Sequence, residues 1–280
     1  MGQIKIVTDS TAEIPAATVA RLGITVVPME IHLNGQVLRD GVNITPHEFF
    51  ERLAASSKPP TTVAPSVEAL RETYASLSNT TDQILSIHIS SKLSPTVVNA
   101  REAASAFWGR SRITVVDSQL LSLGLGLLVI AAAEAATRGS SMEEIVRLLR
   151  GMISHIYIVF FVDSLDYLER SARIDKSQAV LGAMLNIKPL LILEDGEIMP
   201  LEKVRTRGKA IERLQQFVME FARFEKLIIA HGRKTGESQD LLERIAQTFP
   251  DKEILINTYS PSLAVHMGPE ALGVIVYEGM

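Results

Sequence analysis

The fold class follows first from residues 4–13, which read Ile-Lys-Ile-Val-Thr-Asp-Ser-Thr-Ala-Glu. Residues 4–7 are β-branched apart from one lysine, a composition typical of a buried strand. Ser10 and Glu13 follow at the spacing of a capping box, so we expect a helix to begin here and to end near Gly23. A strand that runs directly into a helix is the first half of a crossover between parallel strands.

The same alternation continues through the first half of the chain. Strand-like runs at residues 24–33, 84–89 and 113–116 alternate with helix-like stretches at 46–56, 67–77, 95–108 and 119–138. Asn34-Gly35 is a two-residue hairpin signal. The stretch 120–133 is the most apolar, but it is too short to cross a bilayer and meets Glu134, so we expect a buried helix.

The second half has a different pattern. Ser140 with Glu143 predicts a helix start, and an aromatic strand follows at 157–162. Asp195-Gly196 predicts a hairpin within 190–198, which requires antiparallel pairing. Further strands are expected at 227–230, 254–257 and 274–277, with helices at 208–224 and 238–249.

These patterns predict an α/β protein of two domains. We expect residues 1–155 to form a parallel sheet with helices on both faces, and residues 156–280 to form a mixed sheet with helices. The length of 280 residues is consistent with two domains of ordinary size. A ligand is expected where the carboxyl ends of the parallel strands form a crevice.

Composition excludes several classes of function. The formal net charge of −4 gives no positive field for nucleic acid or anionic membranes. The absence of cysteine removes disulfides, zinc–thiolate sites and iron–sulfur clusters, and it is consistent with a reducing compartment. The amino-terminal residues lack the pattern of an export signal. We therefore expect a cytoplasmic protein that does not insert into membranes.

Familiar cofactor motifs are also missing. Gly124-Leu125-Gly126 lacks the third glycine of a dinucleotide-binding loop, and the chain contains no Walker loop and no Gly-x-Ser-x-Gly elbow. The six histidines form no metal-spaced pair. We expect no cofactor and no metal.

Candidate site residues cluster after strands and in proline-rich segments. Three strand ends run into Asp-Ser pairs, where either a ligand site or simple helix capping would explain them: Asp9-Ser10, Asp117-Ser118 and Asp163-Ser164.

The segment Ser90-Ser91-Lys92-Leu93-Ser94-Pro95-Thr96 combines hydroxyl groups with a proline suited to the first helical position. With Ser94 as the N-cap, the helix terminus predicts an anion pocket, although ordinary capping explains the pattern equally well.

Two further segments present polar side chains rigidly. Thr61 and Thr62 lie in a proline-braced extended loop at 58–66, and His266 lies in a loop with two prolines and a glycine at 260–269. A lone loop histidine is more often structural than functional. The basic stretch 203–209, which includes Arg205, predicts either a phosphate or partner contact or a solvated face.

Seven segments, in this order, resemble the DegV family of bacterial fatty-acid-binding proteins, which serve as acyl carriers for a fatty acid kinase. The resemblance spans nearly the whole chain and rests on Asp9-Ser10-Thr11, residues 61–66, residues 90–96, Asp117-Ser118, residues 168–174, Lys188-Pro189 and His266-Met267-Gly268-Pro269. The chain departs from the family's motifs at Val63, Pro95, Ser171-Ala172, Met267 and Glu270.

The resemblance implies a long-chain fatty acid lying between the two domains. Its carboxylate would be held by Thr62, Ser94 and His266, with Thr61 and Ser118 beside them. Arg173 and Arg205 match family positions that would contact a phosphate or the partner. The implied partner is a fatty acid kinase that supplies ATP and metal, so this chain would contribute no catalytic residue.

Two other functions remain open from the sequence. The family's fold resembles the substrate-binding part of dihydroxyacetone kinases, so His266 could act on a small carbonyl compound or in phosphotransfer, supported by Asp9 and Asp117. A structural or regulatory protein with an empty site is the third alternative.

Overall fold

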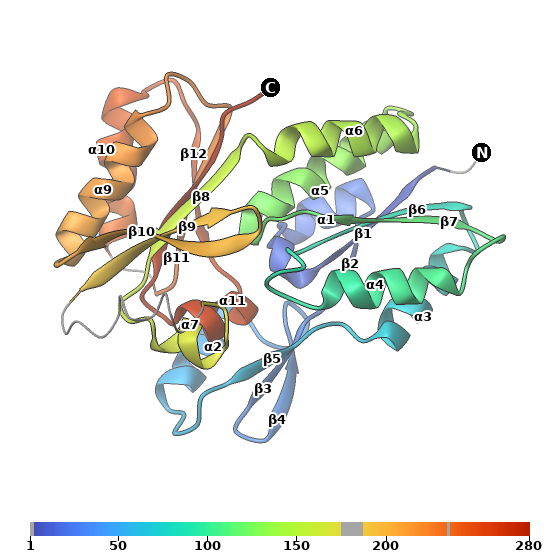
Figure 1. The fold of residues 1–280 in the computed structure, drawn as a ribbon, viewed down its shortest axis with the longest axis horizontal. Helices are drawn as coiled ribbons and strands as arrows, with labels where there is room; N and C mark the ends of the chain where they lie inside the picture. The colour runs from blue at the N-terminus through green and yellow to red at the C-terminus, as the bar shows by residue number, and fades with distance from the viewer. Residues whose placement is uncertain (1–2, 175–186, 234–235) are drawn as a thin grey trace.

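The strands form three β-sheets in the part of the chain that the structure describes (Figure 1). This is a computed structural model, and it describes residues 3–174, 187–233 and 236–280. Two sheets are large and carry the helices. The third is small and lies below them, at the lower edge of the molecule in Figure 1.

The first large sheet is parallel and has the order β2-β1-β6-β7. Its strands are β1 (Lys5–Asp9), β2 (Thr25–Val27), β6 (Gln83–His88) and β7 (Arg112–Asp117). Helices α3 (Val67–Leu77) and α4 (Thr96–Ser105) cover one face, and α1 (Ala16–Leu22), α5 (Ser122–Thr137) and α6 (Met142–Ile153) lie on the other (Figure 1). The predicted parallel α/β layer is confirmed.

The second large sheet is mixed and has the order β10-β9-β8-β13-β11-β12. All its pairs are antiparallel except β11 with β12. Helices α9 (Arg207–Met219) and α10 (Gly236–Thr248) pack on its outer face (Figure 1). Its strands are β8 (Ile156–Phe161), β9 (Lys188–Glu194), β10 (Glu197–Val204), β11 (Lys226–His231), β12 (Ile254–Thr258) and β13 (Leu272–Tyr277).

Helix α5 lies between the two large sheets and is apolar on nearly all sides, as a fully buried helix must be. Its core cluster takes side chains from both sheets, including Leu85 of β6 and Ile158 of β8. All parallel-sheet strands precede residue 155 and all mixed-sheet strands follow it. Because one core spans both sheets, the division into two domains at this point stays a prediction. Among the described helices, none is long and apolar enough to cross a bilayer.

The small sheet has the order β4-β3-β5 and corrects two predictions. Residues 24–33 form two strands instead of one, because Pro28 breaks the run between β2 and β3 (Glu30–Leu33). The predicted hairpin then joins β3 to β4 (Gln36–Arg39). Thr61 and Thr62 lie in a strand, β5 (Thr61–Val63), and not in a loop, because their β-branched side chains suit pairing with β3.

The capping box predicted at Ser10 and Glu13 does not form. Residues 10–12 instead make a short 3-10 turn, η1 (Ser10–Ala12), which the carboxylate of Asp9 caps, and α1 begins only after Pro15. Glu13 adopts a left-handed backbone conformation with φ of 53°, and its side chain bonds to distant segments.

Two other capping boxes do form, and one of them lies a residue away from its predicted position. The box at Thr45 and Glu48 forms and starts α2 (Pro46–Ala54), within the helix-like stretch expected at 46–56. The box before α6 forms at Ser141 and Glu144, one residue later than predicted, because Ser140 N–H ends α5 by bonding back to Ala135 O.

Candidate functional site

Thr62 and His266 meet across 204 residues of sequence. Thr62 Oγ1 and His266 Nε2 are 2.8 Å apart. Pairing of β5 with β3 places Thr62 opposite Ile31 and fixes its strand. His266 lies in the last turn of a helix, α11 (Pro261–Met267), and not in a loop as predicted, because Ser260 caps that helix and Pro261 occupies its first position.

His266 is held in its neutral form. Burial, and to a lesser degree the positive charge of Arg173, lowers the pKa of its imidazole to about 3. Its second nitrogen, Nδ1, is buried and has no hydrogen-bond partner within the described structure. A neutral imidazole with one free nitrogen can donate to or accept from a ligand without bringing a buried charge.

Ser94 is buried at the start of α4, with its hydroxyl 2.8 Å from Thr96 Oγ1. Pro95, and not Ser94 as predicted, is the N-cap residue of α4. The Ser94 hydroxyl still accepts from Thr96 N–H at 3.4 Å, and the Ser94 N–H bonds to Ser90 O in the preceding turn. The turn is tied down by Ser90, whose hydroxyl donates to Gly196 O of the β9–β10 hairpin at 2.7 Å. Contact with the mixed sheet therefore positions Ser94.

Thr62, Ser94 and His266 share one narrow cavity of about 40 Å³, here called the inner cavity. Arg173, Thr11 and Ser262 add polar groups, and the remaining walls are apolar: Met29, Ile89, Leu93, Leu121, Leu168, Ile198, Leu263 and Met267. Thr11, Ile89 and Leu121 follow the carboxyl ends of β1, β6 and β7, which is where an open α/β sheet places its ligand site.

An outer hollow of about 290 Å³ adjoins the inner cavity. The two share Thr62, Arg173 and His266, which we call the polar entrance. Thr61 lines only the outer hollow, together with Tyr167, Ser171 and Arg170. Sequence reasoning missed Arg170, whose guanidinium lies over the Tyr167 ring with its Cζ 4.9 Å from the centroid, although it lies within the 168–174 segment already singled out.

A deep cavity of about 20 Å³ lies beyond the inner one, against the mixed sheet. The two share Leu121 and Met267, and the deep cavity is otherwise lined mainly by apolar residues of β8 and β13. The polar entrance thus leads to the inner cavity and then to the deep cavity, and the walls become more apolar along this order. Typical ligand pockets hold about 300–1,000 Å³. An occupant longer than a few water molecules must therefore move the walls apart, Leu121 and Met267 first.

Other predicted residues lie outside these hollows. Ser118 closes the turn after β7, where its hydroxyl accepts from Leu120 N–H at 3.0 Å. Arg205 is exposed just after β10 and lines none of the three hollows. Asp117 accepts from Ser91 and Gln119, as a turn-capping residue does.

Asp9 is also fully engaged. Its carboxylate accepts from Thr11 and from Ile89 N–H, and it pairs with His88 Nδ1 at 3.0 Å. Asp9 and Asp117 thus anchor the loops after their strands, and the structure gives neither the role of supporting His266 in an enzyme.

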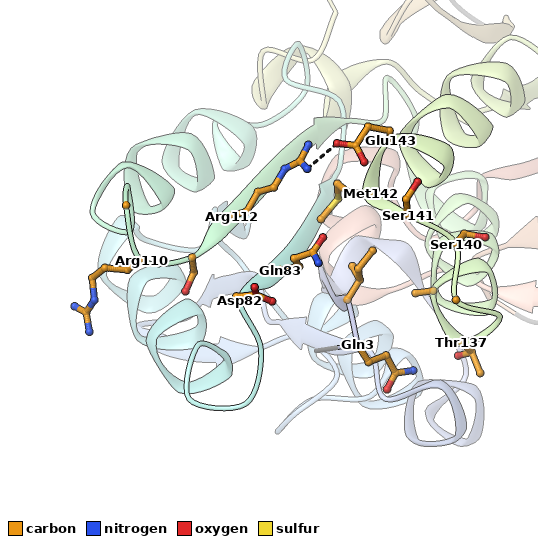
Figure 2. A pocket seen from close by; sticks show the side chains of 15 residues that line it. Gln3, Asp82, Gln83, Arg110, Arg112, Thr137, Ser140, Ser141, Met142 and Glu143 are labelled. Atoms are coloured by element: carbon orange, nitrogen blue, oxygen red, sulfur yellow. Dashed lines mark ion pairs between the residues drawn. The ribbon is translucent and has the colours of Figure 1, made fainter. Parts of the chain in front are cut away.

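A surface hollow of about 960 Å³ lies at the opposite end of the parallel sheet (Figure 2). It lies beside the first residues of β6 and β7, Gln83 and Arg112. Figure 2 shows Arg112 paired with Glu143, at 2.6 Å, and Arg110 extending away from the hollow. Polar groups do not converge there, so its size does not mark it as the functional site.

The fold and site define an α/β protein in which a polar entrance leads to an enclosed apolar interior between two sheets. The family model for the DegV family of uncharacterised proteins matches residues 3–279. A DegV domain-containing protein of Streptomyces coelicolor is 37% identical, over 98% of each chain. The chain therefore belongs to the DegV family.

Solved structures agree with this assignment. A DegV family protein of Thermus thermophilus, described by its fatty acid binding, superposes with a TM-score of 0.89 at 35% identity, covering 99% of this chain and 100% of that one. DegV of Bacillus subtilis, described as a fatty acid binding protein, superposes with a TM-score of 0.91 at 29% identity and the same coverage. The predicted resemblance and fold class are confirmed.

Proposed function

We propose that this chain binds one long-chain fatty acid, with its carboxylate at Thr62, Ser94 and His266 and its tail directed through the inner cavity into the deep cavity. The observation that carries this proposal is the contact of Thr62 with His266 in a cavity whose walls are mainly apolar. The fatty acid binding described for the Thermus thermophilus and Bacillus subtilis proteins supports it.

The energetics suit a lipid. About fifteen buried methylenes at roughly 0.8 kcal/mol each contribute on the order of 12 kcal/mol. This gain must offset both the cost of association and the work of separating the cavity walls. The tail therefore supplies the affinity, and the polar entrance sets the orientation.

The head group needs replacements for its lost water. The Ser94 hydroxyl supplies one neutral hydrogen bond, and the Thr62–His266 pair supplies a second, from either Thr62 O–H or His266 Nδ1–H, because the other proton of the pair is used between them. Arg173 adds a nearby positive charge, which remains partly buried and donates to Ser171 O at 3.1 Å. The arrangement stabilises an anion without a bidentate ion pair, so one carboxylate oxygen stays free to react.

We further propose that the chain presents this carboxylate to a fatty acid kinase for acyl-phosphate formation. The outer hollow leads to the polar entrance, and Arg170 and Arg173 line it. Two guanidinium groups beside the acceptor oxygen suit an incoming phosphoryl group. The kinase would supply ATP and metal, and this chain would act as the binding subunit.

Solvent extraction of freshly purified protein, followed by mass spectrometry, tests the binding function. We expect saturated or unsaturated long-chain acids at close to one per chain, because burial of an acyl tail among the apolar walls contributes most of the binding free energy. Extracts free of such acids, together with ATP-dependent turnover of a small carbonyl compound by the chain alone, would overturn the proposal in favour of the enzyme alternative.

A further inference from the structure

Helix α11 contributes two buried polar side chains to the wall of the inner cavity. Ser262 and His266 are four residues apart, so they lie on the same face of this helix, and both line the inner cavity. Of the two, only His266 also borders the outer hollow. Ser262 is therefore a polar residue of the cavity, about one helical turn before the polar entrance, that the proposed head-group site does not use.

The hydroxyl of Ser262 is buried without a hydrogen bond. The residue is 1% exposed, and its Oγ makes no hydrogen bond within the part of the chain that the structure describes. His266 Nδ1 is in the same state, on the same face of the helix. Leaving a buried polar atom unpaired costs free energy, so native proteins rarely keep one without a reason. Two such atoms on the wall of one cavity indicate a polar ligand group that pairs with them.

Asp40 is the neighbouring acid that could compete for the Ser262 hydroxyl. Burial raises the pKa of the Asp40 carboxyl, and the nearby Ser262 lowers it in part. Oδ2 of Asp40 already accepts from Ser10 Oγ at 3.0 Å, whereas the Ser262 hydroxyl completes no hydrogen bond to this carboxyl. Because no bond fixes it, the hydroxyl can rotate towards a ligand in the inner cavity without a loss elsewhere in the protein.

The proposed carboxylate has more acceptor sites than its assigned partners can fill. An ionised carboxyl group accepts about four hydrogen bonds. Ser94 supplies one, and the Thr62–His266 pair supplies one more, because the other proton of that pair is used between them. Arg173 adds charge, but its guanidinium already donates to Ser171 O. Acceptor sites that lose water without a replacement weaken binding, so the head group needs a further donor.

We propose that Ser262 is a further head-group residue: its hydroxyl donates to one oxygen of the fatty-acid carboxylate, while the Thr62–His266 pair donates to the other. This inference rests on the proposed fatty-acid binding. It adds a residue by which the site distinguishes an acid from a lipid with a single neutral oxygen.

The spacing of the two side chains suits a carboxylate. Cβ atoms four residues apart on a helix are about 5–6 Å from each other. Charge-assisted hydrogen bonds to a carboxylate are about 2.7–2.9 Å long, so one carboxylate can lie between Ser262 and His266 and accept from both sides. An alcohol brings one neutral oxygen, which Ser94 and the Thr62–His266 pair already satisfy. Loss of the Ser262 hydroxyl should therefore affect the acid far more than the alcohol.

The test is the partition of radiolabelled palmitate, and separately of radiolabelled 1-hexadecanol, between delipidated protein and phosphatidylcholine vesicles. We expect Ser262→Ala to weaken palmitate binding at least about fivefold, and hexadecanol binding less than about twofold. Ser262→Cys keeps the side-chain volume but offers only a weak donor, so it should weaken palmitate binding as alanine does. The melting temperature of the lipid-free Ser262→Ala protein should not fall, because the lost hydroxyl had no hydrogen bond.

Ser118→Ala is the matched control, because Ser118 is equally buried but lines neither the inner cavity, nor the outer hollow, nor the deep cavity. Its hydroxyl accepts from Leu120 N–H, so this variant should lose melting temperature and keep both affinities.

Three outcomes for Ser262→Ala would overturn the inference. The first is unchanged palmitate affinity. The second is an equal loss for palmitate and hexadecanol, which would indicate a change in cavity shape. The third is a lower melting temperature with unchanged affinity, which would make Asp40 the partner of the hydroxyl. Failure of the proposed function would look different, because wild-type protein would then take up no palmitate from the vesicles, and the inference would fail with it.

Discussion

The double substitution Thr62→Val with Ser94→Ala should weaken fatty-acid binding more than any other change at the site that leaves the fold intact. Both residues line the inner cavity, where the proposed carboxylate loses its water. Each lost hydroxyl leaves a charged oxygen unsatisfied, at a cost of about 1 to 3 kcal/mol, or roughly five- to 150-fold in Kd for each single variant. Isothermal titration with a delipidated protein measures the effect.

Thr114→Val makes the same chemical change within β7 and serves as the control, because Thr114 lines neither the inner cavity, nor the outer hollow, nor the deep cavity. It should leave the Kd unchanged. Unchanged affinity in both Thr62→Val and Ser94→Ala would remove these hydroxyls from the head-group site.

Gly126→Ala should be the most damaging single-methyl change in α5. A Cβ at this position would collide with the backbone carbonyl of Ala12, which cannot turn aside as a side chain can. Even after the roughly 1 kcal/mol gain in helix propensity, we expect a net loss of about 2 kcal/mol or more in the free energy of unfolding. The close approach also positions η1, so lipid binding should weaken too.

Gly124→Ala offers a matched comparison two residues earlier in the same helix. Its Cβ would meet the tip of the Ile158 side chain, with Cδ1 at 2.8 Å, and that tip can move. Urea unfolding should show a change below about 1 kcal/mol, since the gain in helix propensity offsets the adjustment. Equal destabilisation by the two substitutions would contradict the role assigned to the Ala12 carbonyl.

Local patterns in the sequence predicted the layers well. Strands ending at Asp9 and Asp117, apolar residues 119–138 and the hairpin at Asp195-Gly196 each depend on neighbouring residues, and the structure has all of them. Thr62, Ser94 and His266 were singled out by residue type, rigid surroundings and family resemblance, and they line one cavity. Their assignment to a carboxylate stays a prediction.

The sequence could not predict the hydrogen bonds that distant residues form in place of local ones. Ser10 and Glu13 have capping-box spacing, but Asp40 takes the serine hydroxyl and Ser260 and Asn257 take the glutamate. The same holds for the contact between Thr62 and His266, which requires that β5 and α11 pack together.

A one-residue ambiguity is a second kind of failure. Ser140 and Ser141 both have a glutamate three residues on, so spacing alone fits either box. The structure uses Ser141, and Glu143 is left to pair with Arg112 of β7. The position at which α5 ends selects Ser141, because the Ser140 N–H bonds back to Ala135 O.

A crystal structure of the protein purified with its own lipid tests the central claim most directly. The account predicts a carboxylate within hydrogen-bond distance of Ser94 Oγ and of either Thr62 Oγ1 or His266 Nδ1, with the tail passing between Leu121 and Met267 and those two side chains moved apart. Density for a lipid elsewhere on the molecule, with the inner and deep cavities still closed, would contradict it.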